Sequence, residues 1–414
     1  MGSGIAQTCA AFDDKRKGRP VSDGTARQVY IVSGARTPMT EYSGAFKDLS
    51  AEALGVHAAR AAIERAAVSA DAIDHVVFGH VIQTSAYATR HLALSAGVPV
   101  AVPALTVNRL CGSGIEAAVC AGQMVETQRA EVVLCGGIES MTQAPHVVRG
   151  LRSGLRLGQG KLEDSLLTSL FDTHCDLSMA ATAERCAANY GVSRSDQDEY
   201  ALFSQRRAAE AWNAGRFADE VIAVDVPSRK GAQRITRDDH LRPDSTLADL
   251  SKLAPVVGKD GTVTAGNASG IVDGAAALVL ASGDAVSQHG LKPLARLVAS
   301  ATVGVDPATM GMGPAPAIRK LLTAASLTLD DIDLFEVNEA FAAQYLAVER
   351  ELGLDRQKTN VNGGAIALGH PLGMTGARLL LTLSLELRRR GLRRGIASAC
   401  IGGGQGIAAL IETV

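Results

Sequence analysis

Residues 69–78 read Ser-Ala-Asp-Ala-Ile-Asp-His-Val-Val-Phe, and residues 328–337 read Thr-Leu-Asp-Asp-Ile-Asp-Leu-Phe-Glu-Val. In each stretch an Asp, Asp74 or Asp333, stands before an apolar run that is typical of a buried strand. Two further pairs of stretches echo each other in the same order: Thr106-Val-Asn-Arg with Asn360-Val-Asn-Gly, and Cys135-Gly-Gly with Cys400-Ile-Gly-Gly. Ordered echoes at nearly constant separation predict an internal duplication.

Strands and helices alternate on either side of these stretches. A β-branched run predicts a strand at 28–33, an Ala-rich stretch predicts a helix over 51–67, and apolar runs predict strands at 75–79, 104–108 and 130–135. Such alternation predicts an α/β fold in which helices cover parallel sheets. We therefore expect two similar α/β halves.

The predicted boundaries give a tail at residues 1–27, a first half at 28–292 and a second half at 293–414. Within the first half, residues 140–271 shift toward Arg, Asp and irregular loops and carry one helical stretch, Met179–Ala214. We expect this segment to be an insertion. The tail mixes charges of both signs, and we expect it to be disordered.

Composition excludes several classes of function. The 414 residues carry 41 Lys and Arg against 43 Asp and Glu, which argues against a nucleic-acid partner. Seven Cys without a Cys-x-x-Cys pair are typical of a reducing compartment and argue against a disulfide scaffold or a metal site. No apolar run reaches the roughly 18 residues of a membrane span.

The N-terminal stretch bears on the compartment. It has no apolar segment of the kind that a secretory signal needs. Its acidic pair, Asp13 and Asp14, weakens the case for a mitochondrial presequence. We expect a cytoplasmic protein, with a mitochondrial one as the alternative.

Cys111 lies in Val107-Asn-Arg-Leu-Cys-Gly-Ser-Gly, a Gly-rich turn between a predicted strand and a predicted helix. Unpaired amides and the dipole at a helix N-terminus favour a thiolate, so we expect a lowered pKa and a nucleophilic role for this thiol. The alternative is an inert buried thiol, which is common for a lone Cys.

His370 lies in a Gly-rich loop, Gly363-Gly-Ala-Ile-Ala-Leu-Gly-His-Pro-Leu-Gly, which presents the imidazole instead of packing it. It could act as a general base for a thiol or as a donor to an oxyanion, and a structural His is the alternative. If the duplication holds, this loop and the Cys111 turn occupy equivalent positions in the two halves, so we expect them to meet.

Cys400 and Asn338 each follow a predicted strand. Cys400 opens a Gly-rich turn that could form an anion nest and hold a second active thiol. Asn338 could fix a water or a carbonyl oxygen, and helix capping is its alternative role. Two thiols, a His and an Asn suit thioester exchange combined with carbon-acid chemistry.

Several blocks of the sequence resemble the thiolase family. They are Asn108-Arg-Leu-Cys-Gly-Ser-Gly, Thr264-Ala-Gly-Asn-Ala-Ser-Gly, Asn338-Glu-Ala-Phe, Gly369-His-Pro-Leu-Gly and Cys400-Ile-Gly-Gly-Gly. The resemblance covers residues 28–414 and is nearest to the mitochondrial-type 3-ketoacyl-CoA thiolases. It implies a five-layer α/β/α/β/α fold of two duplicated halves, with an inserted loop domain that covers coenzyme A.

The resemblance also implies roles for the site residues. Cys111 would be the acylated nucleophile, His370 its activator, and Cys400 the group that moves the substrate α-proton. His370 and a water on Asn338 would form one oxyanion hole, and the backbone N–H groups of Cys111 and Gly402 the other. Coenzyme A would be a substrate and not a permanently bound cofactor, and no metal is implied.

Coenzyme A would meet a second set of residues. The resemblance implies that Met179 and Ser269 line the pantetheine pocket and that Arg242 contacts the nucleotide. Arg242 ends a locally basic stretch, 228–242, which is either a solvated face or a phosphate-facing patch. The resemblance favours the phosphate-facing patch.

The implied function is a CoA-dependent acyltransferase that interconverts 3-ketoacyl-CoA plus CoA with acyl-CoA plus acetyl-CoA by a ping-pong mechanism. Short-chain members of the family often carry His where this chain has Ser178, so we expect longer or branched acyl chains to be accepted. An acetoacetyl-CoA-specific biosynthetic thiolase and a non-catalytic acyl-CoA-binding protein are the alternatives. We expect a homo-oligomer, a dimer or a tetramer, with the loop at 140–158 tying the tetramer.

Overall fold

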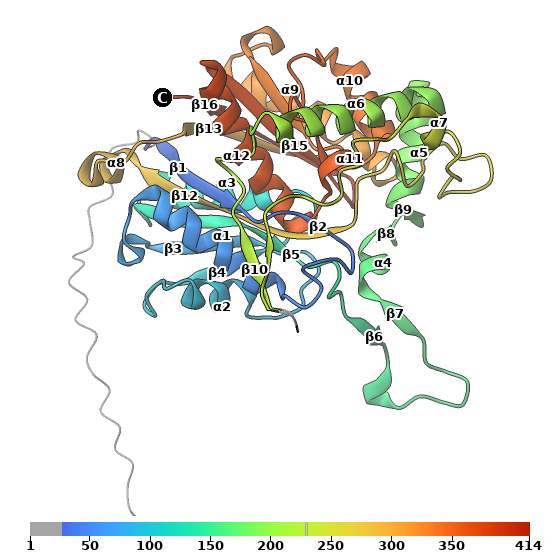
Figure 1. Cartoon of the computed structure of the whole chain (residues 1–414), viewed down its shortest axis with the longest axis horizontal. Coiled ribbons are helices and arrows are strands. Elements are labelled where there is room, and N and C mark those ends of the chain that lie inside the picture. Colours follow the sequence, from blue (N-terminus) through green and yellow to red (C-terminus); the bar gives the residue numbers. More distant parts are fainter. Residues whose placement is uncertain (1–26, 228, 230) are drawn as a thin grey trace, which may run out of the picture.

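The computed structural model describes residues 27–227, 229 and 231–414, so the tail predicted at 1–27 lies outside them except for its last residue. Within the described residues, one ten-stranded sheet runs through the molecule (Figure 1). Its first half has the order β1 (Val29–Arg36), β12 (Val272–Ser282), β5 (Val132–Glu139), β3 (His75–Gly79), β4 (Ala104–Val107), with β2 (Thr40–Glu41) added to β12. Its second half has the order β13 (Ala295–Gly304), β16 (Gln405–Glu412), β15 (Arg394–Ile401), β14 (Leu334–Val337). Antiparallel pairing of β1 with β13 joins the halves.

The sheet is mixed, so the expectation of parallel sheets was wrong for six of the nine strand pairings described. β3 is parallel to β4 and β5, and β14 is parallel to β15. By contrast, β12 is antiparallel to β1, β2 and β5, and β16 is antiparallel to β13 and β15. β16 returns from β15 through the short turn at 402–404, and a tight turn can join only antiparallel strands.

The helices divide the molecule into five layers, as the α/β/α/β/α prediction requires. α3 (Ser113–Glu126) and α12 (Leu372–Arg390) lie between the two halves of the sheet and pack against the inner faces of both. α1 (Ala51–Ala66) and α2 (Ala88–Ser95) cover the outer face of the first half. α9 (Pro314–Ala325) and α10 (Ala342–Leu352) cover that of the second half. α8 (Gly283–His289) lies between β12 and β13 in the chain.

The two halves repeat one another down to single hydrogen bonds. The Asp74 carboxylate accepts from the backbone N–H of Glu131, at 2.8 Å, where the chain enters β5. The Asp333 carboxylate accepts from the N–H of Arg394, also at 2.8 Å, at the start of β15. Each Asp therefore fixes the start of the neighbouring parallel strand in the same way, which explains the echo between residues 69–78 and 328–337.

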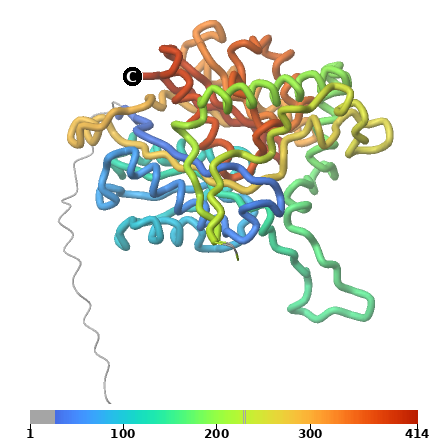
Figure 2. The backbone as a smooth tube through the Cα atoms, viewed as in Figure 1, coloured from blue at the N-terminus to red at the C-terminus, as the bar shows by residue number. Residues whose placement is uncertain are grey.

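Residues 140–271 run between β5 and β12, which are neighbours in the sheet. They begin with an arm that projects from the body (Figures 1 and 2), made of β6 (His146–Val148), β7 (Leu162–Asp164), α4 (Ser165–Ser169), β8 (Phe171–Asp172) and β9 (Leu177–Ser178). They continue with α5 (Met179–Tyr190), α6 (Arg194–Asn213), β10 (Val224–Val226), β11 (Gln233–Ile235) and α7 (Leu247–Leu250). The single helical stretch predicted over Met179–Ala214 was wrong, because Gly191 adopts φ 62° and ends α5.

Short 3-10 turns lie at Ala70–Ala72, Leu151–Ser153, Pro307–Met312 and Leu329–Asp331, and a one-turn helix, α11, at Ala365–Leu368. Among the residues that the structure describes, no helix combines the length and apolar character that crossing a membrane requires.

Candidate active site

Cys111 lies in a rigid turn between β4 and α3. Leu110, directly before it, adopts φ 45°, a left-handed conformation that sharpens the turn. The Ser113 hydroxyl closes the turn from the inside, because it accepts from the N–H of Arg109 at 2.9 Å and donates to the carbonyl of Leu110 at 2.6 Å. The thiol is therefore held at the beginning of α3, as the sequence predicts.

The pKa of Cys111 does not follow the prediction. Burial raises the pKa of this thiol to about 11, and the N–H groups of Gly402 and of Cys111 itself lower it by less. Glu139, a buried carboxyl group, raises it further. The expectation of a lowered pKa was wrong because the apolar side chains around the turn remove more stabilisation from the thiolate than the amides supply.

His370 is held by hydrogen bonds on both ring nitrogens. Its Nδ1 lies 2.6 Å from Thr375 Oγ1, and its Nε2 lies 3.3 Å from Asn338 Nδ2. The backbone N–H of His370 donates to the carbonyl of Gly270 at 2.9 Å. Burial, together with the positive charge of Arg378, lowers the pKa of the imidazole to about 3, so the ring is neutral.

Asn338, Cys400 and Gly402 surround this pair. Asn338 follows β14, and its buried Oδ1 has no hydrogen-bond partner among the residues that the structure describes, as an oxygen that binds a water or substrate would. Cys400, near the end of β15, is fully buried and packs against Met179, Met310 and Ala340, and burial and the Cys111 thiol hold its pKa well above the usual range. Gly402 directs its N–H to Cys111.

One cavity of about 450 Å³ is lined by both Cys111 and His370, whereas Asn338, Cys400 and Gly402 are not part of its wall. Its wall includes Cys111 and His370 with Ser178, Met179 and Ser269. The rest of the wall is almost entirely apolar: Met141, Leu167, Leu170, Phe171, Ala180, Ala268, Gly270, Ile271, Met310, Ala340, Phe341 and Leu372. The cavity can hold an apolar chain against a thiol and a neutral imidazole.

Arg242 lies in a second cavity, of about 310 Å³, and not in the first. His240 lines this second cavity and lies directly on Gly270, which lines the first; a Cβ atom at Gly270 would meet the imidazole at 2.4 Å. The two cavities are therefore neighbours, with the contact between Gly270 and His240 between them. Arg242 itself is exposed and pairs with Glu41. Ser228 and Lys230 of the basic stretch lie outside the described residues.

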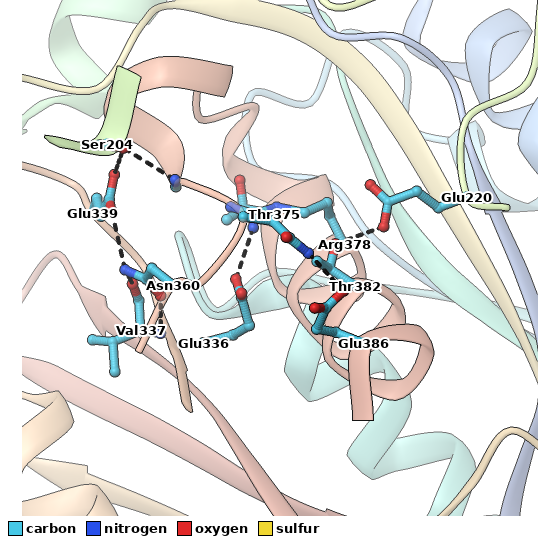
Figure 3. Close-up of polar contacts among 12 residues, drawn as sticks. Ser204, Glu220, Glu336, Val337, Glu339, Asn360, Thr375, Arg378, Thr382 and Glu386 are labelled. Carbon is cyan, nitrogen blue, oxygen red and sulfur yellow. Dashed lines mark hydrogen bonds and ion pairs between the residues drawn. The ribbon is translucent and has the colours of Figure 1, made fainter. Parts of the chain in front are cut away.

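Sequence reasoning missed three buried side chains that hold the site together. Glu139 accepts from the N–H groups of Val81, Ile82 and Gly373 and so ties β5 to the start of α12. Glu339, next to Asn338, accepts from Ser204 and Asn360 (Figure 3), and it also accepts from Tyr200 and the N–H of Ile366. Thr375 contacts His370. Glu339 could have been found from the Asn338-Glu-Ala-Phe block. By contrast, no local sequence pattern marks Glu139 or Thr375 as part of the site.

No group of three or more His, Cys, Asp or Glu side chains is placed to hold a metal ion within residues 27–227, 229 and 231–414.

Two models of known protein families match this chain. The model described as thiolase, N-terminal domain, matches residues 29–284, and that described as thiolase, C-terminal domain, matches residues 291–413. The chain belongs to the thiolase family.

Individual thiolases agree with this membership. The human mitochondrial 3-ketoacyl-CoA thiolase is 53% identical over 391 residues, which cover 94% of this chain and 98% of the human protein. Beta-ketothiolase BktB of Cupriavidus necator is 47% identical over 94% of this chain and its own full length. A crystal structure of the human enzyme in complex with CoA superposes with a TM-score of 0.91, at 53% identity over 94% of this chain and 98% of that one.

This thiolase is an acyltransferase that acts as a 3-ketoacyl-CoA thiolase or an acetyl-CoA acetyltransferase. The relatives include mitochondrial animal proteins and bacterial proteins.

Proposed function

We propose that this thiolase cleaves 3-ketoacyl-CoA with acyl chains longer than acetoacetyl, through an acyl-enzyme on Cys111. The observation that carries the proposal is the apolar cavity of about 450 Å³ around Cys111. The thiol itself packs in a cluster of aliphatic side chains that includes Met141, Leu166 and Leu372. An acyl chain longer than acetyl gains free energy there because it leaves water for an apolar wall.

Cleavage begins at the sulfur of Cys111. The sulfur attacks the 3-keto carbon while His370 takes the thiol proton at Nε2, and the carbonyl oxygen becomes an oxyanion. The N–H groups of Cys111 and Gly402 are directed at the sulfur and its surroundings, where they stabilise that oxyanion. Collapse of the oxyanion breaks the bond between C2 and C3 and leaves a thioester on Cys111.

The electron pair of the broken bond passes to acetyl-CoA as an enolate. Cys400 donates a proton to its C2, and His370 with a water on Asn338 Oδ1 stabilises the enolate oxygen. The raised pKa of Cys400 keeps it a protonated donor until that step. A new CoA thiol then gives its proton to the Cys400 thiolate and attacks the Cys111 thioester. The bond between the acyl carbon and the Cys111 sulfur breaks, and this sulfur takes back the proton that His370 holds. Acyl-CoA is released, so that the two half-reactions follow a ping-pong order.

Coenzyme A would extend from the first cavity past Gly270 into the second. Met179 and Ser269 would contact the pantetheine there, and Arg242 would contact a phosphate of the nucleotide. The closeness of the two cavities, on either side of the contact between Gly270 and His240, supports this path. The human relative crystallised with CoA supports the binding of CoA itself.

Chain length is tested with acetoacetyl-, 3-ketohexanoyl- and 3-ketododecanoyl-CoA. We expect kcat/KM to rise at least about tenfold from the first substrate to the second, since each methylene in an apolar pocket contributes about 1 kcal/mol or more. A kcat/KM that is highest for acetoacetyl-CoA would favour the acetoacetyl-CoA-specific alternative. No acyl adduct on Cys111 in quenched samples would favour the non-catalytic acyl-CoA-binding protein.

Ser178 offers a second test. Its side chain lines the cavity and also caps α5, since it accepts from the N–H of Ala181 at 3.2 Å. Ser178→His should lower kcat/KM for 3-ketohexanoyl-CoA about tenfold relative to acetoacetyl-CoA, because the ring fills the acyl side. Ser178→Ala is the matched control, since it removes the cap without adding bulk. Equal substrate ratios in the two variants would exclude Ser178 from chain-length selection.

Assembly and compartment complete the proposal. We infer a homodimer or homotetramer, because the arm carries apolar side chains that no part of the described chain covers. We retain a cytoplasmic protein as the proposed compartment, on the acidic pair Asp13 and Asp14, with a mitochondrial protein as the alternative.

A further inference from the structure

Each ring nitrogen of His370 has one hydrogen-bond partner among the described residues. The partner of Nδ1 is Thr375, which has no part in the proposed cleavage. His370 Nδ1 and Thr375 Oγ1 lie 2.6 Å apart. Thr375 lies in the first turn of α12, and its side chain is almost fully buried, as is that of His370. A buried contact this short fixes which atom carries the proton.

The direction of the bond follows from a third group. Thr375 Oγ1 also lies 3.0 Å from the carbonyl oxygen of Pro371, one helical turn earlier. A carbonyl oxygen can only accept, so the single hydroxyl hydrogen of Thr375 is donated to Pro371. Oγ1 then accepts from His370, and Nδ1 carries the hydrogen.

The contact on the other side of the ring requires the same tautomer. Asn338 Nδ2 lies 3.3 Å from His370 Nε2, and an amide nitrogen can only donate. Nε2 must therefore present its electron pair. Two separate contacts, from α12 and from the residue after β14, thus assign one neutral tautomer to a ring that lines the cavity with Cys111.

We propose that Thr375 is a positioning residue that holds His370 in the Nδ1–H tautomer, so that Nε2 carries the electron pair that takes the proton of Cys111. The inference rests on the proposed roles of Cys111 and His370. When Nε2 takes the thiol proton, the ring becomes an imidazolium whose Nδ1–H stays on Thr375. The new Nε2–H can then be donated to an oxyanion or returned to a leaving thiolate, and Thr375 accepts throughout.

The opposite tautomer would block the first step. With the hydrogen on Nε2, the ring could donate to an oxyanion but could not accept the thiol proton. The nearby Arg378, whose guanidinium pairs with Glu336 at 3.1 Å, disfavours a doubly protonated resting ring (Figure 3). The choice between neutral tautomers therefore decides whether His370 can act as a base.

Thr375→Val tests the proposal, because valine keeps the shape and removes the acceptor. The measurement is the rate of Cys111 acetylation by acetyl-CoA, followed by rapid quench and mass spectrometry. We expect the rate constant to fall about 10²- to 10⁴-fold, the range for losing a correctly oriented general base, while the acetyl-CoA concentration at half-saturation changes less than about threefold. Thr375→Ser, which keeps the hydroxyl, should restore the rate to within about threefold of wild type.

Thr382→Val is the matched control. Thr382 is buried on the same helix, and its hydroxyl donates to Glu220 at 2.8 Å, away from the cavity (Figure 3). We expect acetylation within about twofold of wild type for this variant. Should Thr375→Val not fold, Thr375→Ala supplies the same comparison with less buried bulk.

The outcomes distinguish a failure of the proposed role of His370 from a failure of the positioning role of Thr375. Wild-type acetylation in His370→Ala would overturn the proposed role of His370 itself. Slow acetylation in His370→Ala with near wild-type rates in Thr375→Val would leave that role standing and overturn the positioning role of Thr375. Equal losses in the Thr375→Val and Thr382→Val variants, or no restoration by Thr375→Ser, would also overturn it.

Discussion

At the scale of single residues, Cys111 and His370 form a neutral pair at rest. Burial raises the pKa of the thiol to about 11 and lowers that of the imidazole to about 3, so neither group is charged near neutral pH. A thiolate–imidazolium pair would be costly in this apolar cavity. Proton transfer must therefore accompany bond formation at sulfur, when the charge moves to an oxyanion held by N–H groups.

This neutral pair predicts a pH dependence. In wild type, alkylation of Cys111 by iodoacetamide should vary little between about pH 6 and 9, because the neutral imidazole is present throughout that range. In His370→Ala, only the thiolate reacts, so the rate should rise about tenfold per pH unit as the pH approaches the pKa of Cys111. Mass spectrometry of the modified peptide measures both rates, and parallel profiles in the two proteins would contradict a base role for His370.

Cys400 and Cys135 allow the second thiol to be tested with a matched pair. Both are buried cysteines, Cys135 in the middle of β5 and Cys400 near the end of β15. Cys400→Ala should retain label exchange between acetyl-CoA and free CoA but lose condensation by about 10²-fold or more, because only condensation needs a proton moved at carbon. Cys135→Ala should retain both reactions. Loss of exchange together with condensation in a folded Cys400→Ala variant would contradict a pure acid/base role.

At the scale of elements, α12 is central because it packs against α3 and β5 and begins two residues after His370. Its glycines permit this approach. A Cβ at Gly137 of β5 would lie 1.9 Å from the carbonyl oxygen of Gly373, and a Cβ at Gly114 of α3 would lie 2.4 Å from the backbone nitrogen of Ala377. The backbone of α12 thus contacts the backbone of β5 and α3 directly. Side chains at these glycines would hold the Cys111 turn and the His370 loop further apart.

Two glycines of α3 give a direct test of this packing. Gly114→Ala should lower the free energy of unfolding by about 1–3 kcal/mol or more, because the new methyl group meets backbone that cannot yield. Gly122→Ala, on the same helix, meets side-chain ends and no backbone: Leu297 Cδ2 at 3.1 Å, which can move, and Val29 Cγ1 at 3.7 Å, an ordinary contact. It should be neutral or stabilising, since Ala favours helix over Gly. Thermal unfolding measures the stability of both variants. Equal melting temperatures for Gly114→Ala and Gly122→Ala would refute the role of Gly114 in this packing.

At the scale of the whole molecule, the arm carries exposed apolar side chains that suit a partner subunit. Leu151 is 61% exposed and Leu157 is fully exposed, and both lie between or beside β6 and β7. We expect light scattering at micromolar concentration to give at least twice the 42.9 kDa of one chain. Leu151→Asp with Leu157→Asp should convert a tetramer to a dimer, because buried charge opposes association.

Val414→Asp is the control for the arm variant, since Val414 is exposed at the C-terminus and lies far from the arm in sequence. This variant should keep the wild-type mass. A monomeric wild type would refute the assembly altogether, and an unchanged mass in the arm variant would assign assembly to another surface.

The sequence by itself determined the features that depend on local patterns. The echoing stretches at 69–78 and 328–337 revealed the duplication because each copy must start its strand with the same Asp. The Gly-rich turns at Cys111, His370 and Cys400 revealed the site because tight turns need glycine and a thiol or imidazole in such a turn is presented to a ligand.

Tertiary structure alone decided the features that depend on distant parts of the chain. Strand direction at β12 could not be read locally, because residues 140–271 separate it from β5. The raised pKa of Cys111 arises from apolar groups and a carboxyl group that other elements place around the turn. The tautomer of His370 is set by Thr375 and Asn338 together, and a sequence cannot show which hydroxyl will face which ring nitrogen.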